Sequence, residues 1–299
     1  MQYQPTAIIL ADSISPDGIR LTTFQLTYWR AIHSELMTHR MFSRCAQSSR
    51  ATPIKKNIES VLNNPWRPAV WTANDKGMVA KHDIPEDIVP VVELAWQTAA
   101  KSIATIASAL EQVGLHKQVV NRLLEPFSSI NVVVSSTDWN NFWKLRCAKD
   151  ADPSMQLLAN TMKKAFDASE PKKLNHNDWH LPYINMEKDM ELAKEQFPNL
   201  EDWEIKEAIL PKVSAARCAR VSYKAFDGTT SIKQDIELCD RLIKNNHMSP
   251  LEHVATPDTC VEEVQPYKRI KHWQHFEEHG NFRGWRQLRK MMPNEYIAG

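Results

Sequence analysis

The sequence has 299 residues, a formal net charge of +1 and only seven glycines. Average glycine usage is about 7%. No glycine here falls in a G-x-G-x-x-G or G-x-x-x-x-G-K-[ST] pattern, which excludes nucleotide-binding loops of those two kinds. The balanced charge excludes a protein whose whole surface binds nucleic acid, and the five widely spaced cysteines favour free thiols over disulfides. No signal peptide or apolar run of ~20 residues is present, so we expect a soluble cytoplasmic protein.

The first quarter of the chain predicts one strand and one short helix. Residues 19–28 are rich in β-branched and aromatic side chains, as in strands. A polar, helix-compatible stretch follows from 31 to about 49. Residues 54–62 have the apolar spacing of an amphipathic helix, and residues 63–84 have no period, which indicates a loop or an inserted lobe.

The clearest helix begins near Pro85 and stops at Gly114. Its apolar residues recur at steps of four and three, which is the spacing of one helix face. They are Val92, Trp96, Ala99, Ile103, Ile106, Leu110 and Val113. We interpret this seam as the buried side of a core helix, and a helix packed against a partner subunit is the alternative.

The rest of the chain predicts several helices around one short strand. Residues 130–135 predict a buried strand, and Thr137 is placed to cap the helix that follows it. Because both element types occur without strict βαβ order, we expect an α+β fold with a mixed sheet and long helices. The expected helices cover residues 117–124, 138–146, 155–166, 186–196, 214–223 and 232–245.

The densest cluster of functional side chains runs from Thr38 to Arg50 and holds a histidine, three arginines and three serines. Arginine forks and serine hydroxyls together suit a phosphate group. A solvated basic helix face is the alternative. A second cluster, His247–His253, follows a predicted helix end; its spacing is not that of a zinc site, so we favour a polar cap over a metal site.

Five segments together resemble the flavin-dependent thymidylate synthases. That family shows an Arg-His-Arg segment ending in Ser-x-Arg, Arg-x-x-Leu-Pro, an Asn/His-Phe-Leu-x-Leu-Arg helix, Ala-Ala-Arg-x-Ser-Tyr/Phe, and His-x-Ser/Thr-Pro-Phe-Glu-His. The matching segments here are residues 38–50, 122–126, 141–146, 214–223 (SAARCARVSY) and 247–253 (HMSPLEH).

The order and some residues depart from the family pattern. The last two segments precede the first in the family but follow it by nearly two hundred residues here, so the chain looks circularly permuted or rearranged. Thr38 replaces the first arginine, and Glu35 replaces an upstream glutamine. Cys45 and Ala46 replace an asparagine and an acidic residue. These replacements leave the base specificity open.

The resemblance implies a single catalytic domain over residues 1–299, with insertions near 63–84 and 169–211 and an extra segment at 256–299. It implies an FAD enzyme that uses NADPH and methylenetetrahydrofolate to methylate C5 of dUMP, with active sites at the interfaces of a homotetramer. Arg146 would be catalytic and would face the pyrimidine. The other substrate-binding residues implied are Glu35, Gln47, Ser48, Arg50 and Arg122; the flavin-binding residues implied are His39, Arg40, Ser43, Asn141, Ser249 and Glu252.

Two alternatives stay open. One keeps the chemistry but takes another pyrimidine deoxynucleotide such as dCMP, or transfers a hydroxymethyl group. The other is a catalytically silent relative that acts as a scaffold or binds nucleic acid, using Arg283, Arg286, Arg289 and Lys290 near Trp285. We favour a solvated face or a substrate-entry role for that basic stripe. His272, His275 and His279 fall at helical spacing, but with no acidic or cysteine partner at a ligand spacing we expect no metal site.

Overall fold

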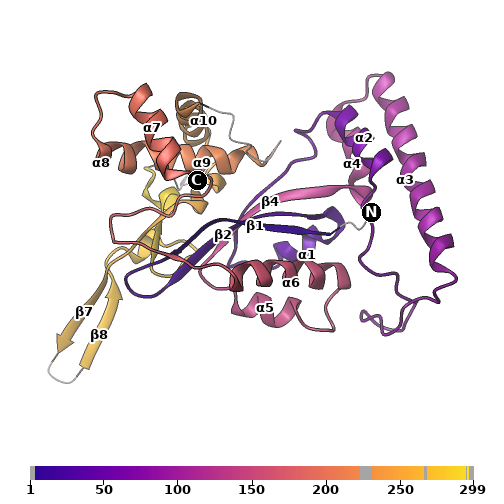
Figure 1. The fold of residues 1–299 in the computed structure, drawn as a ribbon, viewed down its shortest axis with the longest axis horizontal. Coiled ribbons are helices and arrows are strands. Elements are labelled where there is room, and N and C mark those ends of the chain that lie inside the picture. The colour runs from indigo at the N-terminus through magenta and orange to yellow at the C-terminus, as the bar shows by residue number, and fades with distance from the viewer. Residues whose placement is uncertain (1–3, 223–230, 266–267, 294, 296–299) are drawn as a thin grey trace, which may run out of the picture.

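The computed structural model describes residues 4–222, 231–265, 268–293 and 295. Its centre is a five-stranded mixed sheet in the order β3-β4-β2-β1-β5, in which only the β1–β5 pair is parallel. The observed fold class is therefore α+β, as expected, and helices surround the sheet (Figure 1). The strands are β1 (Thr6–Ile14), β2 (Arg20–Trp29), β3 (Ser43–Ala46), β4 (Ser129–Ser136) and β5 (Lys172–Lys173).

One face of this sheet is apolar. In β2 the side chains alternate in the run Phe24 to Tyr28, so the aromatic and leucine side chains share one face. That face packs against α5 (Asn140–Arg146) and α6 (Pro153–Asp167), which lie on the same side of the sheet in Figure 1. Fully buried residues from both layers form this main core: Phe24, Leu26, Tyr28, Val132, Val134, Phe142, Met155, Leu158 and Met162.

The opposite face of the sheet is mixed and is also covered: Leu21 of β2 and Val133 of β4 are fully buried there in two small apolar clusters, beside a row of hydroxyl groups. Thr23 of β2 and Ser135 of β4 lie directly opposite each other in register and are fully buried. The C-terminal part of the chain covers them with His180 and His253. A continuous chain of hydrogen bonds results, running from Ser13 through His180, Thr23 and Ser135 to His253, with heavy-atom distances between 2.5 and 2.9 Å.

A three-helix lobe packs beside the sheet. It consists of α2 (Ile54–Asn63), α3 (Val89–Gln112) and α4 (Lys117–Leu124), and Figure 1 places it on the right. Its small core is separate from the main core. The inward side of α3 is lined by fully buried alanines at helical spacing, namely Ala100, Ala104 and Ala107.

The interpretation of α3 as a core helix buried along its predicted seam was only partly right. Trp96, Ile103 and Leu110 turn inward, but Ile106 is 50% exposed and Val113 is 79% exposed. The predicted apolar residues lie on two neighbouring faces of the helix, of which only one is covered. Apolar spacing predicts that a helix has an apolar side, but it does not predict what covers that side.

The C-terminal half contributes the second helical layer. Its helices are α7 (Met186–Gln196), α8 (Asp202–Glu204), the π-helical turn η3 (Ile205–Ile209), α9 (Leu210–Arg220) and α10 (Ile232–Lys244). Two short strand pairs follow: β6 (Ala255–Pro257) with β9 (Trp285–Gln287), and the hairpin of β7 (Cys260–Gln265) with β8 (Lys268–Trp273). The 3-10 turns are η1 (Arg30–Ile32), η2 (Glu125–Phe127), η4 (Ser249–His253), η5 (Phe276–Glu278) and η6 (Leu288–Met291); α1 (His33–Met37) is a single short helix.

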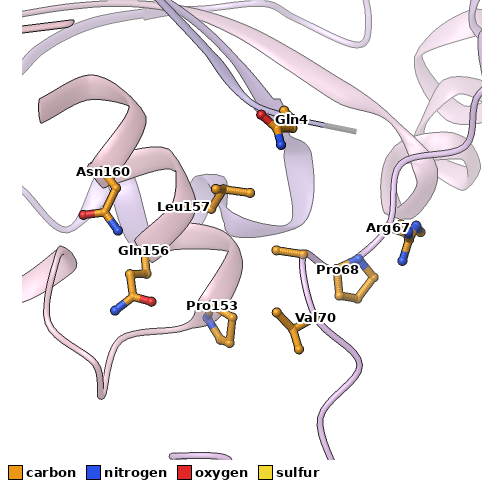
Figure 2. Close-up of a pocket in the computed structure, with 9 residues that line it drawn as sticks. Gln4, Arg67, Pro68, Val70, Pro153, Gln156, Leu157 and Asn160 are labelled. Atoms are coloured by element: carbon orange, nitrogen blue, oxygen red, sulfur yellow. The ribbon is translucent and has the colours of Figure 1, made fainter. Parts of the chain in front are cut away.

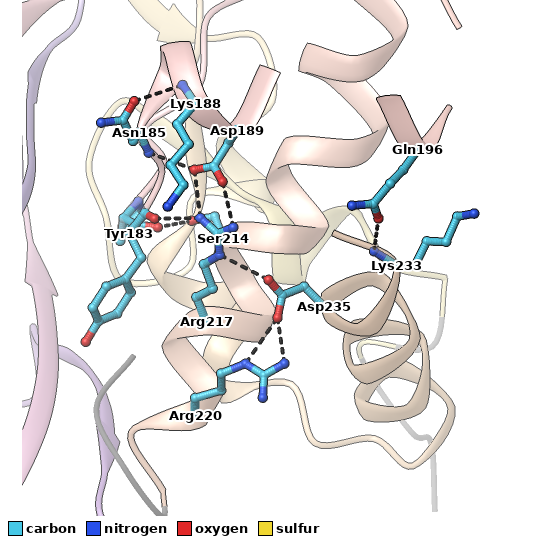
Figure 3. Close-up of polar contacts among 11 residues, drawn as sticks. Tyr183, Asn185, Lys188, Asp189, Gln196, Ser214, Arg217, Arg220, Lys233 and Asp235 are labelled. Atoms are coloured by element: carbon cyan, nitrogen blue, oxygen red, sulfur yellow. Dashed lines mark hydrogen bonds and ion pairs between the residues drawn. The ribbon is translucent and has the colours of Figure 1, made fainter. Parts of the chain in front are cut away.

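A buried ion network joins α7, α9 and α10. The guanidinium of Arg217, 3% exposed, donates to Asp189 at 2.7 Å and to Asp235 at 3.0 Å, and Arg220 donates to the other oxygen of Asp235 at 2.6 Å (Figure 3). A buried charge is tolerated only when it is paired and hydrogen-bonded. The arginines of the SAARCARVSY segment therefore hold helices together.

Most sequence-based elements are confirmed, and two expectations are wrong. The stretch 31–49, expected to be helix-compatible throughout, contains β3, a strand that exists through its pairing with β4. Thr137 does not cap α5; its hydroxyl accepts from the Arg283 backbone N–H, and Asp138 accepts from the first turn. His272, one of the three histidines at helical spacing, lies in strand β8. The expected helix end at residues 222–223 lies partly outside the described residues. In the described part of the chain, none of the helices combines the length and the apolar character of a membrane span.

Candidate functional site

Arg146 is the centre of the best-defined polar cluster. Phe142 anchors α5 in the main core, and Arg146 follows one turn later, at the C-terminal end where a cation is favoured. Its three guanidinium nitrogens donate to different partners: Nη1 to Glu35 Oε2 at 2.8 Å, Nε to His39 Nε2 at 3.0 Å, and Nη2 to Thr38 Oγ1 at 3.2 Å.

The protonation of this cluster follows from its surroundings. Burial, followed by the nearby charges of Arg146 and Arg44, lowers the pKa of His39 to about 4. His39 is therefore neutral near pH 7 and can accept a hydrogen bond at Nε2. Burial and the charge of Asp152 raise the pKa of Glu35, although Arg146 opposes the shift.

A cavity of about 170 Å³ opens beside this cluster. It lies between the segment 38–42 and α5, which brings the sequence-predicted residues His39, Arg40, Asn141 and Arg146 into one place. The side chains of Arg40 and Asn141 are exposed and make no hydrogen bond among the described residues. Two donors are thus free at the rim of the cavity.

A second group of predicted residues lies at the other end of β3. Arg50 and Arg122 are exposed, and within the described chain neither has an ion-pair partner. The Asn121 side chain donates to the backbone carbonyls of Ser49 at 2.7 Å and Thr52 at 2.9 Å. These bonds hold α4, which carries Arg122, against the loop that carries Arg50. These two exposed guanidinium groups on adjoining backbones have the geometry and charge that suit an anion.

Gln47 and Ser48 shape the loop that carries Arg50. The Gln47 side chain accepts from the backbone and the side chain of Asn131 and donates to Thr52. The Ser48 backbone N–H donates to the Ser222 carbonyl at 2.8 Å. This bond attaches the end of the SAARCARVSY segment to the loop after β3, although the two are far apart in sequence.

Ser43 and Glu252 lie in a third group, with residues that the sequence did not single out as a site. Ser43 is buried, and its hydroxyl bonds Asn281 at 3.0 Å and Gln287 at 3.2 Å. Glu252 forms an ion pair with Arg289. In the sequence, the one feature that pointed to this group was that Asn281 and Gln287 lie next to the basic residues Arg283, Arg286 and Arg289. Ser249 is exposed, and neither it nor Glu252 lines the cavity beside Arg146.

The C-terminal histidines and basic residues are engaged within the chain. His275 Nδ1 and His279 Nε2 both bond the buried carboxylate of Asp258, at 3.0 and 2.9 Å. The sequence expectation overlooked this acidic partner because it lies 17 residues upstream of His275. The basic stripe is largely neutralised: Arg286 pairs with Glu278, Lys290 pairs with Glu295, and Trp285 is fully buried.

A larger cavity of about 300 Å³ lies away from these groups. It lies between α6 and the segment 67–70, and Figure 2 shows Leu157 of α6 on the side towards Pro68 and Val70. The Gln156 amide donates to the Ala148 carbonyl at 2.6 Å. None of the predicted site residues lines this cavity.

Comparison with known proteins gives one family. The family model described as thymidylate synthase complementing protein matches residues 20–172, just over half of the chain. This range contains the Arg146 cluster, Arg50 and Arg122, whereas the segments 214–223 and 247–253 lie beyond it. No curated protein sequence matches the chain.

Some solved structures are partly similar. They include the UMP/dUMP methylase PolB from Streptomyces cacaoi bound with 5-Br dUMP, with 12% identity, a TM-score of 0.45, and coverage of 55% of this chain and 90% of that chain. Another is the flavin-dependent thymidylate synthase ThyX from Helicobacter pylori complexed with FAD and dUMP, with 17% identity, a TM-score of 0.34, and coverage of 49% and 67%. The family assignment rests on the match over residues 20–172.

Proposed function

The chain belongs to the thymidylate synthase complementing protein family, and we propose that it is a flavin-dependent enzyme that methylates C5 of a pyrimidine deoxynucleotide. The observation that carries the proposal is the cluster of Arg146, His39 and Glu35 inside the range matched by the family model. The proposed cofactor is FAD, with NADPH and methylenetetrahydrofolate as co-substrates. The proposed substrate is dUMP.

The phosphate of the nucleotide would bind at the loop after β3. Arg50 and Arg122 have no competing carboxylate among the described residues, so their forks are available for a dianion. Ser48 lies two residues before Arg50 and its hydroxyl would add a donor. Gln47 would act by holding this loop against Asn131.

The pyrimidine would lie against Arg146. The three nitrogens of this guanidinium already donate to Glu35, His39 and Thr38, so its planar face is the surface best suited to a ring. Guanidinium planes stack on aromatic rings. Neutral His39 fixes the plane by accepting from Nε, and a fixed positive charge beside the ring would stabilise negative charge that develops on it.

The residues beside Arg146 fit part of a flavin. Arg40 and Asn141 offer free donors at the cavity rim, and His39 and Phe42 stack with ring centroids 5.6 Å apart. The cavity of about 170 Å³ is smaller than a typical cofactor pocket, which measures roughly 300–1,000 Å³. When bound, the flavin would supply the hydride chemistry. Ser249 and Glu252 do not line this cavity, so for them to contact a flavin the site must be completed by another subunit, as in the proposed homotetramer. Ser43 is buried against Asn281 and Gln287, so it would support the site without touching the flavin.

A specific observation favours a second candidate substrate, dCMP. Glu35 stands where the family pattern has glutamine, and its carboxylate lies 2.8 Å from the arginine proposed to face the base. A carboxylate accepts hydrogen bonds, and cytosine presents a donating amino group where uracil presents an acceptor. Glu35 therefore suits cytosine better than a glutamine would.

The deciding experiment is a product assay on the full-length protein. Purified protein is incubated separately with dUMP and dCMP in the presence of FAD, NADPH and methylenetetrahydrofolate, and the product mass is measured. We expect a methylated nucleotide from dUMP; a product from dCMP alone would establish the second candidate. Glu35→Gln should shift the preference towards dUMP. Protein that neither carries nor binds a flavin and yields no product would refute both.

Matched variants test the roles of the arginines. Arg146→Ala should lower kcat by about 100-fold or more without releasing the flavin, because one positioned electrostatic group contributes roughly that factor. Lys144→Ala removes a charge from the same helix at an exposed position and should leave kcat unchanged. Arg122→Ala should raise KM for the nucleotide, whereas Lys117→Ala on the same helix should not.

A further inference from the structure

The outer face of α3 is an uncharged stripe that the single chain leaves in contact with solvent. Along this face every residue is apolar or small, and all but the half-buried Val92 are exposed. A solvated helix face normally carries charged side chains. We call these residues the α3 stripe: Ile88, Val92, Ala95, Ala99, Ser102, Ile106, Ala109 and Val113.

The spacing of the stripe is that of a two-helix coiled coil. The steps between successive members alternate between four and three residues over the whole length of α3, which has 24 residues and spans about 36 Å. The neighbouring positions on the open edge are also uncharged, since Thr98, Thr105 and Gln112 lie there. The stripe therefore fits one long helix, and it offers no charge for nucleic acid or an anionic lipid surface.

The sizes of the side chains indicate which helix fits. Reversing the direction of the stripe about a point between Ala100 and Lys101 maps the stripe onto itself. Val92 then faces Ala109, and Ala95 faces Ile106, so in these intermediate layers a large side chain meets a small one. The central layer combines Ala99 with Ser102, which permits close approach, and the end layers combine Ile88 with Val113.

We propose that the α3 stripe binds the α3 stripe of a second copy of this chain, antiparallel and about a twofold axis at the middle of the helix. A twofold interface requires that residue i contacts j and j contacts i, which is the property of this stripe. The small alanines on the inner side of α3 bind its own lobe, while the larger Ile106 and Val113 are left for the partner. This interface does not depend on the proposed enzymatic function.

The first test measures mass in solution. The full-length protein should have an even multiple of the chain mass of 34.4 kDa in sedimentation or light scattering. Ala99→Glu places a charge from each copy in the central layer and should raise the dissociation constant at this interface about 100-fold or more. Gln97→Glu adds the same charge at an exposed position of α3 outside the stripe and should keep the wild-type mass. Circular dichroism verifies that both variants are folded.

The second test fixes the direction and register. Ala95→Cys and Ile106→Cys are made as separate proteins. In an antiparallel pair residue 95 faces residue 106 of the second copy, whereas identical positions lie about 16 Å apart along the axis. Oxidation should therefore cross-link a mixture of the two variants but neither variant alone. A monomeric wild type, an Ala99→Glu protein with unchanged mass, or cross-linking of each variant with itself would overturn the proposal. Wild-type protein controls for its own partly accessible thiols, Cys147 and Cys260.

Discussion

The two faces of the central sheet are formed by the same strands, but one is packed by large apolar side chains, whereas the other combines apolar contacts with a buried chain of hydrogen bonds. On one face Phe24, Leu26 and Val134 bury their whole side chains against α5 and α6. On the other face Thr23 and Ser135 meet His180 and His253 through hydrogen bonds. The apolar face gains free energy from the area removed from water, whereas each polar contact gains little and is costly when left unmade.

The difference between the two faces explains how the C-terminal half is positioned. An apolar surface can be packed in several ways by side chains of suitable volume. A row of hydroxyl groups accepts only a partner whose donors and acceptors match it. The hydroxyl row therefore favours a docking position in which His180 and His253 meet it, while Leu21 and Val133 add apolar contacts with the C-terminal half.

The largest effect is expected on the apolar face. Phe24→Ala should lower the free energy of unfolding by about 3–5 kcal/mol, because a cavity replaces a fully buried ring that packs edge-on against Trp139. Urea denaturation measures the loss. Phe276→Ala removes the same ring at a position that is 71% exposed and should change stability by less than about 0.5 kcal/mol. A small loss for Phe24→Ala would remove the distinction between the faces.

A smaller effect is expected on the mixed face. Ser135→Ala should cost about 1–3 kcal/mol, since it leaves Thr23 and His253 Nδ1 buried without this partner. The comparison is again by urea denaturation, with Ser60→Ala on the exposed side of α2 as the control. A loss as large as that of Phe24→Ala would show that packing, not hydrogen bonding, dominates on both faces.

The pH dependence sharpens the comparison further. Burial lowers the pKa of His180 to about 3, against an ordinary value of 6.5. The unfolded chain therefore binds a proton below pH 6.5 that the folded chain does not, and stability falls as the pH is lowered from 6.5 towards 3. His180→Gln should reduce the slope of unfolding free energy against pH by about 1.4 kcal/mol per pH unit between pH 6 and 4. An unchanged slope would mean that His180 is protonated in the folded protein.

The sequence predicted the strands and helices where local pattern is strong, and missed those that depend on distant partners. The β-branched and aromatic residues of 19–28 predicted β2, and Gly114, with φ +83°, ends the α3 region as expected. The four residues of β3 have no strand signal of their own and are ordered by pairing with β4. The strand β1 was not anticipated, because its burial is partial along most of its length.

The candidate site shows the same division. The resemblance between segments identified Arg146, His39 and Glu35 as site residues, and the structure brings them within hydrogen-bond distance. It could not indicate that Gln287 binds Ser43, 244 residues away, or that Arg289 of the basic stripe pairs with Glu252. Such contacts follow from topology.

The α+β class, the long helix before Gly114 and the family could be predicted from the sequence, because periodicity and motif residues are local properties of the chain. What covers each surface became clear from the folded chain. The fold places the C-terminal half on the mixed face of the sheet, Glu35 on Arg146, and the α3 stripe in solvent. The physical reason is that apolar spacing and hydroxyl content state what a surface requires, while burial depends on which distant segment meets that requirement.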